Sequence, residues 1–300
     1  MAGGDNPHYP VGFSLIINRE DGTMTIRKIT QWMFCLIVAG LLAVTAVQAD
    51  ELDDIIAKGK VRCGVMLDVP PVGMRDAKNQ PIGYDVEFCK DMAKALGVEP
   101  VIVETTAPDR IPAILSGRVD VGVASATNTL ERAKSVAFTI PYQIWEVGIA
   151  VKADDTSIAK YEDLIGKKVG TVRGTYAEAE FLKDFKAWES KGTSYVSYGS
   201  NSEQFLALQQ GKVDALLEST AIFGEYIKGP GKGKIKIATN VPKIPADWTG
   251  LMVKRGQQGL LNWLNLFVWH QWKTGRTDEL YRAWFGYPAP NMAFPGVHGY

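Results

Sequence analysis

Histidine and cysteine are scarce in this sequence, with three of each among 300 residues. The histidines, His8, His270 and His298, lie far apart, and neither residue type has the spacing of a metal site. No Ser–His–Asp arrangement or other catalytic set can be recognised. The formal net charge is zero, so the composition gives no reason to expect a nucleic acid as partner. We therefore expect no metal, no cofactor and no nucleic-acid ligand.

The sequence has a single long apolar run, residues 32–47, which follows the basic segment T-I-R-K and ends in V-Q-A. The run is shorter than the ~20 residues of a spanning helix, and this order is typical of a secretory signal peptide. Cys35 lies inside the run, which argues against a lipoprotein. We predict an upstream extension over residues 1–23, a signal peptide over residues 24–49 with cleavage after Ala49, and a periplasmic protein. A membrane anchor is the alternative.

Residues 117–142 carry the most informative pattern. Valine at every second position predicts a buried strand over residues 119–124. Ser125, Thr127 and Arg132 follow its carboxyl end, where open α/β sheets bind ligands. Hydroxyls, N–H groups at a helix start and a guanidinium would suit a carboxylate. The alternative is that the hydroxyls cap a short helix and the arginine forms a surface ion pair.

A related pattern occurs later in the chain. Residues 116–125 read S-G-R-V-D-V-G-V-A-S and residues 210–219 read Q-G-K-V-D-A-L-L-E-S, each after an apolar, helix-like segment. A repeated helix–glycine–strand unit indicates two similar lobes, although two copies could be a coincidence of composition. Strands and helices alternate over the rest of the chain, which predicts parallel sheets in an α/β fold.

Local signals set the expected ends of several elements. We expect Asp85 to cap a helix that Gly97 ends, and Ser202 to cap another. Residues 194–198 are predicted as a strand and residues 258–274 as a long helix, from their apolar spacing.

Cys63 and Cys89 would lie in an oxidising compartment after export. Cys63 falls in a predicted strand, residues 61–67, and Cys89 in the helix that follows. Because a helix packs on its strand in such a unit, a disulfide is geometrically possible. We predict this disulfide, with two buried free thiols as the alternative.

Several short motifs occur in a fixed order. They are Pro70-Pro71, Gly83-Tyr84-Asp85-Val86, Arg110-Ile111-Pro112-Ala113, Ser125-x-Thr127-x-x-x-x-Arg132, Pro141-Tyr142, Leu164-x-Gly166-Lys167-Lys168-Val169-Gly170, Gly174-Thr175, Gly211-Lys212-Val213-Asp214-Ala215, Gly275-Arg276-Thr277 and Trp284-Phe285-Gly286. With them the chain resembles bacterial solute-binding proteins of family 3, the exported receptors of polar amino acid ABC transporters, over nearly all of residues 50–287.

The resemblance implies a two-lobed, type II periplasmic-binding-protein fold. Its parallel-rich sheets would be flanked by helices, with a ligand cleft between the lobes and a hinge of two strands. Residues 50–142 and 250–300 would form lobe 1, and residues 145–247 lobe 2.

The resemblance also implies roles for individual residues. The positions of Ser125, Thr127 and Arg132 hold the ligand's α-carboxylate in this family, with help from the helix start at Thr175-Tyr176. Arg110 resembles an arginine that faces the side-chain carboxylate in relatives that bind acidic amino acids.

Three departures from the family pattern bear on the ligand. Ser219 stands where the family usually has an aspartate for the ligand's ammonium, and the acid is Glu218, one position earlier. A one-residue shift in a strand turns a side chain to the opposite face. Val69 replaces an aromatic residue, and Asp68 would substitute for an acid near Met66. A small carboxylate is therefore a safer expectation than a standard α-amino acid. The candidate ligand contacts are Asp68, Val69, Arg110, Ser125, Ala126, Thr127, Arg132, Thr175, Tyr176, Glu218 and Ser219.

The favoured function is that of a monomeric transport receptor, which closes around its small-molecule ligand by a hinge and docks on a membrane ABC permease. One alternative is a dehydratase-like periplasmic enzyme of the same fold, with Glu218 as a general acid. A ligand-sensing partner of a signalling receptor is a further alternative.

Overall fold

The computed structural model of the protein describes residues 50–292. The chain divides into two compact units, Met1–Gln48 and Ala49–Tyr300, and all described residues belong to the second unit. The predicted upstream extension, signal peptide and cleavage site lie outside the described residues. Within residues 50–292, no helix is both long enough and apolar enough to cross a membrane.

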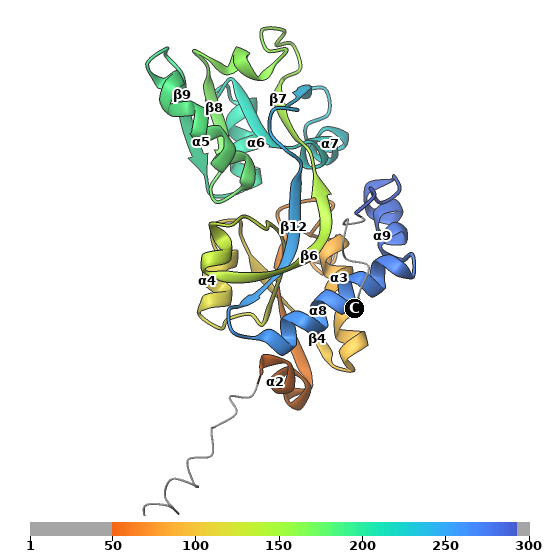
Figure 1. Cartoon of the computed structure of the whole chain (residues 1–300). Helices are drawn as coiled ribbons and strands as arrows, with labels where there is room; N and C mark the ends of the chain where they lie inside the picture. The colour runs from red at the N-terminus through yellow and green to blue at the C-terminus, as the bar shows by residue number, and fades with distance from the viewer. Residues whose placement is uncertain (1–49, 293–300) are drawn as a thin grey trace, which may run out of the picture. The chain divides into compact units, whose positions relative to one another are not determined.

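The second unit contains two five-stranded sheets, each with its own helices (Figure 1). The first sheet has the order β4-β1-β5-β12-β6, and we call it and its helices lobe 1. Its elements are α2 (Glu51–Lys58), β1 (Lys60–Met66), β2 (Met74–Arg75), β3 (Pro81–Ile82), α3 (Tyr84–Leu96), β4 (Glu99–Thr105), α4 (Arg110–Leu115), β5 (Val121–Thr127), η1 (Arg132–Lys134), β6 (Val136–Trp145), β12 (Asp247–Lys254), α8 (Gln258–Lys273) and α9 (Arg276–Phe285).

The second sheet has the order β11-β7-β10-β8-β9 and forms lobe 2 with its helices. Its elements are β7 (Val147–Lys152), η2 (Tyr161–Leu164), β8 (Lys168–Val172), α5 (Tyr176–Glu189), β9 (Ser194–Tyr198), α6 (Asn201–Gln209), β10 (Ala215–Ser219), α7 (Thr220–Lys228) and β11 (Ile235–Asn240). The chain crosses between the lobes twice, from β6 to β7 and from β11 to β12 (Figure 1). The two-lobed α/β fold is therefore confirmed.

The sheets are mixed and not purely parallel. In lobe 1, β1 pairs in parallel with β4 and β5, whereas β12 pairs antiparallel with β5 and β6. Lobe 2 repeats this arrangement, because β8 pairs in parallel with β9 and β10, whereas β7 pairs antiparallel with β10 and β11. The alternation of helices and strands accounts for the parallel part only. The antiparallel pairings involve the strands that enter and leave the crossings.

The valine pattern of β5 is explained by its central place in lobe 1. Val121 and Val123 are fully buried, and so is Ala124 on the opposite face. A Cβ atom at Gly122 would come within 2.7 Å of the Met252 terminal methyl and 3.2 Å of its Cβ, so a larger residue here would require the Met252 side chain of β12 to move. A strand covered on both faces in this way reads as a continuous apolar run.

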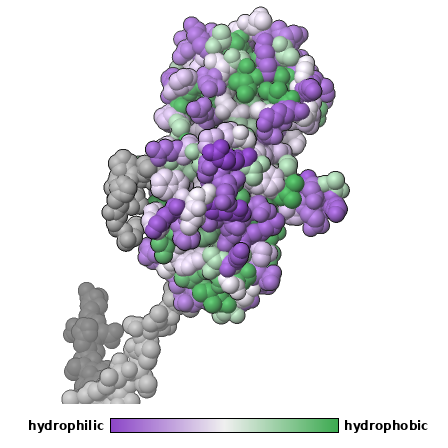
Figure 2. All heavy atoms as spheres, turned by 90° about the vertical axis from the view of Figure 1, so that its right-hand side faces the viewer, coloured by the Kyte–Doolittle hydropathy of each residue, from purple (hydrophilic) through white to green (hydrophobic). Residues whose placement is uncertain are grey.

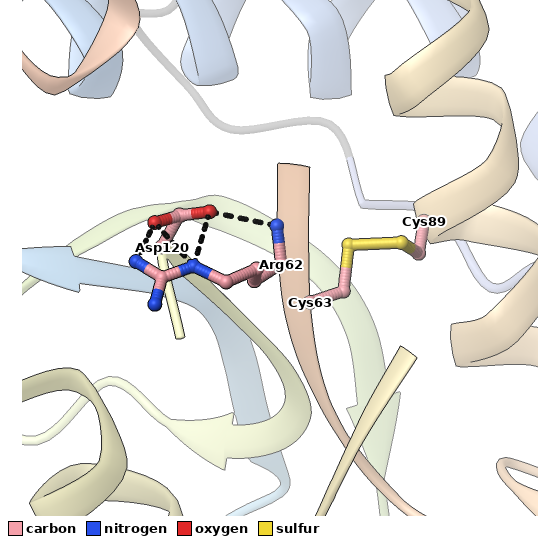
Figure 3. Close-up of a disulfide and its surroundings, with 4 residues drawn as sticks. All are labelled: Arg62, Cys63, Cys89 and Asp120. Atoms are coloured by element: carbon pink, nitrogen blue, oxygen red, sulfur yellow. Dashed lines mark hydrogen bonds and ion pairs between the residues drawn. A yellow bond between two sulfur atoms is a disulfide. The ribbon is translucent and has the colours of Figure 1, made fainter. Parts of the chain in front are cut away.

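The repeated V-D motif has the same structural role in both lobes. In lobe 1, the Asp120 backbone N–H donates to the Arg62 carbonyl at 2.9 Å, and the Arg62 N–H donates to the Asp120 carboxylate at 2.7 Å (Figure 3). In lobe 2, Asp214 and Lys168 exchange the same two bonds, each at 2.8 Å. In each repeat the aspartate just before the strand therefore ties that strand to its parallel neighbour. Asp120 ties β5 to β1, and Asp214 ties β10 to β8.

The predicted disulfide between Cys63 and Cys89 is confirmed (Figure 3). Cys63 lies on β1 and Cys89 on α3, and their Cα atoms are 6.3 Å apart. Both residues are fully buried, so the bond lies inside lobe 1, between sheet and helix.

Two predicted helix caps were wrong. The N-cap of α3 is Gly83, and Asp85 is a fully buried residue in the first turn, whose carboxylate receives bonds from other segments. The N-cap of α6 is Ser200, two residues before the predicted Ser202. The predicted end of α3 at Gly97 is correct, with φ at 71°. In both wrong cases a polar residue two positions after the true N-cap was taken for it: Asp85 for Gly83, and Ser202 for Ser200.

Candidate functional site

A cleft lies between the lobes, beside the crossing strands, at the carboxyl ends of several strands. Its lining residues come from both lobes and from both crossings: Met66, Val69, Val72, Ala107, Arg110, Ser125, Trp145, Thr175, Tyr176, Asn201, Glu218, Ser219, Ile222 and Asp247. These side chains leave about 40 Å³ for groups of the size of water, which is room for a few waters only.

Arg110 is a buried cation at the centre of the cleft wall. One of its nitrogens, Nη1, donates to the Ala124 carbonyl at 2.7 Å and to the Ser125 carbonyl at 3.0 Å. Nη2 donates to the Gly174 carbonyl of lobe 2 at 3.1 Å. Burial, together with the nearby charge of Arg132, lowers the pKa of Arg110 to about 9. Nη1 also contacts the Met66 sulfur at 3.9 Å, so the partners of this guanidinium among the described residues are neutral. A buried cation with neutral partners favours an anion close to it.

Arg132 lies beside Arg110 and makes a similar contact across the cleft. Its Nη2 donates to the same Gly174 carbonyl at 2.7 Å, and its Nη1 donates to the Thr127 carbonyl at 3.2 Å. Burial lowers the pKa of Arg132. Two guanidiniums from lobe 1 therefore converge on one carbonyl oxygen of lobe 2.

Ser125 is in the cleft wall, but its hydroxyl points into a buried polar network. Its Oγ donates to Gln143 Oε1 at 2.7 Å and lies 3.3 Å from Asp85 Oδ2. Its N–H donates to the Tyr142 hydroxyl at 3.0 Å. The hydroxyl that the sequence assigned to a ligand carboxylate thus has partners within lobe 1.

The network is organised by the Asp85 carboxylate. It accepts from the Tyr142 hydroxyl at 2.9 Å and from Gln143 Nε2 at 3.0 Å. Burial raises the pKa of Asp85 well above its usual range. Ser125 has φ at 44°, in the left-handed region that non-glycine residues seldom adopt. The network holds Ser125 in this conformation and so orients the two carbonyls that bind Arg110.

Three further predicted contacts have distinct positions. Thr127 is buried, and its Oγ1 has no hydrogen-bond partner among the described residues. Thr175 is the N-cap of α5, because its Oγ1 accepts from the Glu178 N–H at 3.2 Å. Tyr176 follows it in the cleft wall, where burial, Glu180 and Asp247 raise its pKa to about 12.

Glu218 lies in the cleft wall at the end of β10. One carboxylate oxygen accepts from the Ser219 N–H at 2.8 Å, and the other, Oε2, is buried with no partner within residues 50–292. Burial, with a contribution from the charge of Asp247, raises the pKa of Glu218 to about 7. Ser219 also lines the cleft, and its Oγ caps α7 by accepting from the Ala221 N–H at 3.3 Å.

Asp247 is a cleft residue that the sequence did not reveal. It is the first residue of β12, at the second crossing, and its Oδ1 is buried with no partner in the described part of the chain. Burial raises the pKa of Asp247 to about 6, although the nearby Thr127 hydroxyl, and after it the charges of Arg132 and Arg110, act in the opposite direction. No motif surrounds this residue, and only the fold brings it next to Glu218 and the arginines.

Four of the predicted contacts lie outside the cleft lining, whereas Val69 is part of it: these four are Asp68, Ala126, Thr127 and Arg132. The Asp68 carboxylate accepts from the Asn201 N–H at 3.2 Å and so links lobe 1 to the start of α6 in lobe 2. Burial raises the pKa of Asp68. Ala126 is fully buried on β5.

The cleft lining thus contains one arginine, Arg110, and two acids that each have an oxygen without a hydrogen bond within residues 50–292. Arg132 is not a lining residue, but it shares the Gly174 carbonyl with Arg110. An unpaired buried carboxylate oxygen is costly, and a ligand nitrogen that donates to it would remove that cost. Among the described residues, no group of three or more His, Cys, Asp or Glu could hold a metal ion.

The sequence matches the bacterial extracellular solute-binding proteins, family 3, over residues 61–287. The chain belongs to this family. Among curated relatives, the L-glutamate/L-aspartate-binding protein of Pseudomonas aeruginosa is 29% identical over an alignment 293 residues long, which covers 86% of this chain and 90% of that protein.

Solved structures include other members with similar folds. An ancestral arginine-binding protein bound to arginine is 33% identical, with a TM-score of 0.71, over 76% of this chain and 99% of the other. The ancestral amino acid-binding protein AncCDT-1, a precursor of cyclohexadienyl dehydratase, is 29% identical, with a TM-score of 0.69, over 79% and 100%. The similar family 3 proteins that carry names for their function are amino acid-binding proteins.

Proposed function

We propose that this family 3 protein is the amino acid-binding component of an ABC importer and that its ligand carries both a carboxylate and a cationic nitrogen. The single observation that carries this proposal is the pairing of two convergent arginines with two acids whose free oxygens are buried in the same cleft. The two formal positive charges and two formal negative charges balance, so a zwitterion adds no net charge to the closed cleft.

Arg110 and Arg132 would bind the carboxylate, which would take the place of the Gly174 carbonyl they now share. Charge-assisted, bidentate bonds are stronger than bonds to a neutral carbonyl, which favours this exchange. Glu218 and Asp247 would accept from the cationic nitrogen, and Thr127 Oγ1 offers a further polar contact. Val69 and Tyr176 would contact the rest of the ligand.

The setting of this function is part of the proposal. Relatives with named ligands belong to ABC importers, which supports a membrane permease as the partner and an exported, periplasmic receptor. We expect the protein to act as a monomer and without a cofactor. Lobe 1 would comprise residues 50–142 and 250–300, and lobe 2 residues 145–247.

An enzyme of the same fold is the second candidate, and Glu218 favours it. Its pKa of about 7, raised mainly by burial, suits a general acid, and one structural neighbour is a precursor of a dehydratase. The binding function is preferred because two arginines and two acids could recognise both charged groups of an amino acid. A dehydratase substrate without a cation would leave Asp247 unpaired.

The test is a thermal-shift screen of the mature protein against amino acids and organic acids at about pH 8, where both acids are charged. We expect stabilisation by one group of related amino acids, and an unchanged ligand by mass spectrometry after long incubation. Stabilisation by organic acids alone would reject the role of the two acids, and a new product would favour the enzyme.

A further inference from the structure

A second cavity lies on the other side of the crossing strands. Its volume is about 490 Å³, against about 40 Å³ for the cleft. We call it the hinge pocket, and its lining residues are Ile144, Trp145, Glu146, Thr220, Ala221, Gly224, Glu225, Lys228, Phe285, Tyr287 and Pro290. Its size is within the range of small-molecule sites.

The hinge pocket is built by both lobes and by the crossing between them. Figure 1 shows α4 and α5, which flank the cleft, on one side of β6 and β12, and α7 and α9 on the other. The hinge pocket takes its residues from α7 in lobe 2, from the segment that begins at the end of α9 in lobe 1, and from the β6–β7 junction. Figure 2 views this side, where hydrophilic side chains cover the middle of the molecule and hydrophobic ones gather on the upper lobe.

Aromatic rings form one wall of the hinge pocket. Trp145 meets Phe285 edge to face at 5.3 Å, and Phe285 meets Tyr287 at 5.9 Å between ring centroids. Trp145 also lines the cleft, so one residue contributes to both cavities. An occupant of the hinge pocket would therefore touch a residue that the cleft ligand also meets.

The charges of the hinge pocket favour a cation. Glu225 is paired with Lys228, whereas Glu146 contacts only the neutral Asn240 amide, at 3.3 Å, among the contacts resolved for its side chain. Burial and the negative charges of Glu146 and Glu225 raise the pKa of Tyr287. Both carboxylates therefore act electrostatically on the aromatic wall. A cation over aromatic rings gains further from their negative faces.

The two cavities respond oppositely to a rotation of the lobes. On the cleft side, the lobes are held together by the arginine bonds to Gly174 and by the Asp68–Asn201 bond. The crossing strands lie between the cavities, so a rotation that widens the cleft brings α7 and the end of α9 together. It would narrow the hinge pocket. A molecule that fills this pocket would therefore favour the closed cleft.

We propose that the hinge pocket is a second small-molecule site, that it takes an amine with an aromatic or apolar body, and that its occupancy strengthens ligand binding in the cleft. The last part rests on the proposed function, whereas binding in the hinge pocket itself does not.

Gly224 makes the proposal testable by mutation. It lies on α7 in the pocket wall, and a Cβ atom there would meet nothing within 4 Å. Gly224→Leu would add a side chain in the pocket wall whose Cβ atom has no clash. Gly224→Ala is the matched control because it gives a similar gain in helix propensity but little filling.

The first experiment is calorimetry of the intact protein with tryptamine, and with indole-3-acetate as a probe of the same shape and opposite charge. We expect millimolar or tighter binding of tryptamine only, retained in Gly224→Ala and Glu218→Gln, and lost in Gly224→Leu. Glu146→Gln should weaken it about threefold or more, as expected for one exposed ion pair. No binding, equal binding of the two probes, or unchanged binding in Gly224→Leu would overturn the proposal.

The second experiment measures the cleft ligand found by screening, in the presence and absence of saturating tryptamine. We expect its affinity to rise about fivefold or more, a typical coupling, and Gly224→Leu without tryptamine to show a similar rise. An unchanged or lower affinity would overturn the coupling. If no cleft ligand exists, the proposed function fails, but closure of the lobes can still be tested by small-angle scattering of Gly224→Leu and Gly224→Ala. We expect the Gly224→Leu variant to be the more compact of the two. Equal dimensions would overturn the proposed effect on closure.

Discussion

The affinity for a zwitterionic ligand should fall as the pH is lowered from about 8 to about 6, because the two acids of the cleft lose their charge in this range. Burial raises the pKa of Glu218 to about 7 and that of Asp247 to about 6. A protonated acid cannot pair with the ligand's cation. The ligand's own nitrogen stays protonated throughout if it is an alkylammonium or a guanidinium.

The size of the effect follows from these values. If only the charged form binds, an acid weakens the apparent affinity by the factor 1 + 10^(pKa − pH), so Glu218 contributes about tenfold between pH 8 and pH 6 and Asp247 about twofold more. The product is about twentyfold. The stability of the free protein depends on pH in the opposite sense, because both pKa values lie above those of an unfolded chain. The stability that these acids contribute is fully present below about pH 4 and is lost progressively as the pH rises from about 4 to about 7.

Calorimetry of the wild type, of Glu218→Gln and of Asp247→Asn at three pH values is the assay. Each single variant should bind more weakly at about pH 8, and Glu218→Gln should keep only about a twofold pH effect. A pH-independent affinity in the wild type, or the full dependence in the variant with both acids replaced, would refute the role of these acids.

Three other results are expected. Arg132→Ala should lower ligand affinity by about 30-fold to about 5000-fold, since a buried charge pair costs about 2–5 kcal/mol to break, and a change below about threefold by calorimetry would make this arginine structural. Replacing both Cys63 and Cys89 by alanine should lower the free energy of unfolding by about 3.5 kcal/mol for a sequence separation of 26, and an unchanged denaturant midpoint would contradict this. Asp85→Asn should lower the free energy of unfolding by about 1–3 kcal/mol in the same assay, because donors that now bond the carboxylate would lose their acceptor. The same change should weaken ligand binding, and an unchanged affinity would reject a positioning role for Asp85.

Local patterns predicted the fold well where one signal acted alone. The strand over residues 194–198 has the predicted bounds, and α8 ends one residue before the prediction. The strand β6 was not predicted, because the proline at position 141 interrupts its pattern, and only pairing with β12 makes it continuous. The disulfide could be predicted because its strand and helix are adjacent in the chain.

The cleft was less predictable, because long-range contacts decide where polar atoms point. Sequence reasoning named Arg110, Arg132 and Glu218, which lie on or beside elements of the repeated unit. It could not find Asp247, which lacks a motif, nor the use of the Ser125 hydroxyl by a buried network. Whether these residues bind a ligand remains a prediction.

The most direct test of a cleft built for a zwitterion is calorimetry with three related compounds: the amino acid found by screening, the amine that remains after its carboxylate is removed, and the acid that remains after its α-amino group is removed. The intact amino acid should bind at least about 30-fold more tightly than either analogue, since each analogue leaves buried charges unpaired. Equal affinity for the amino acid and the deaminated acid would contradict the account.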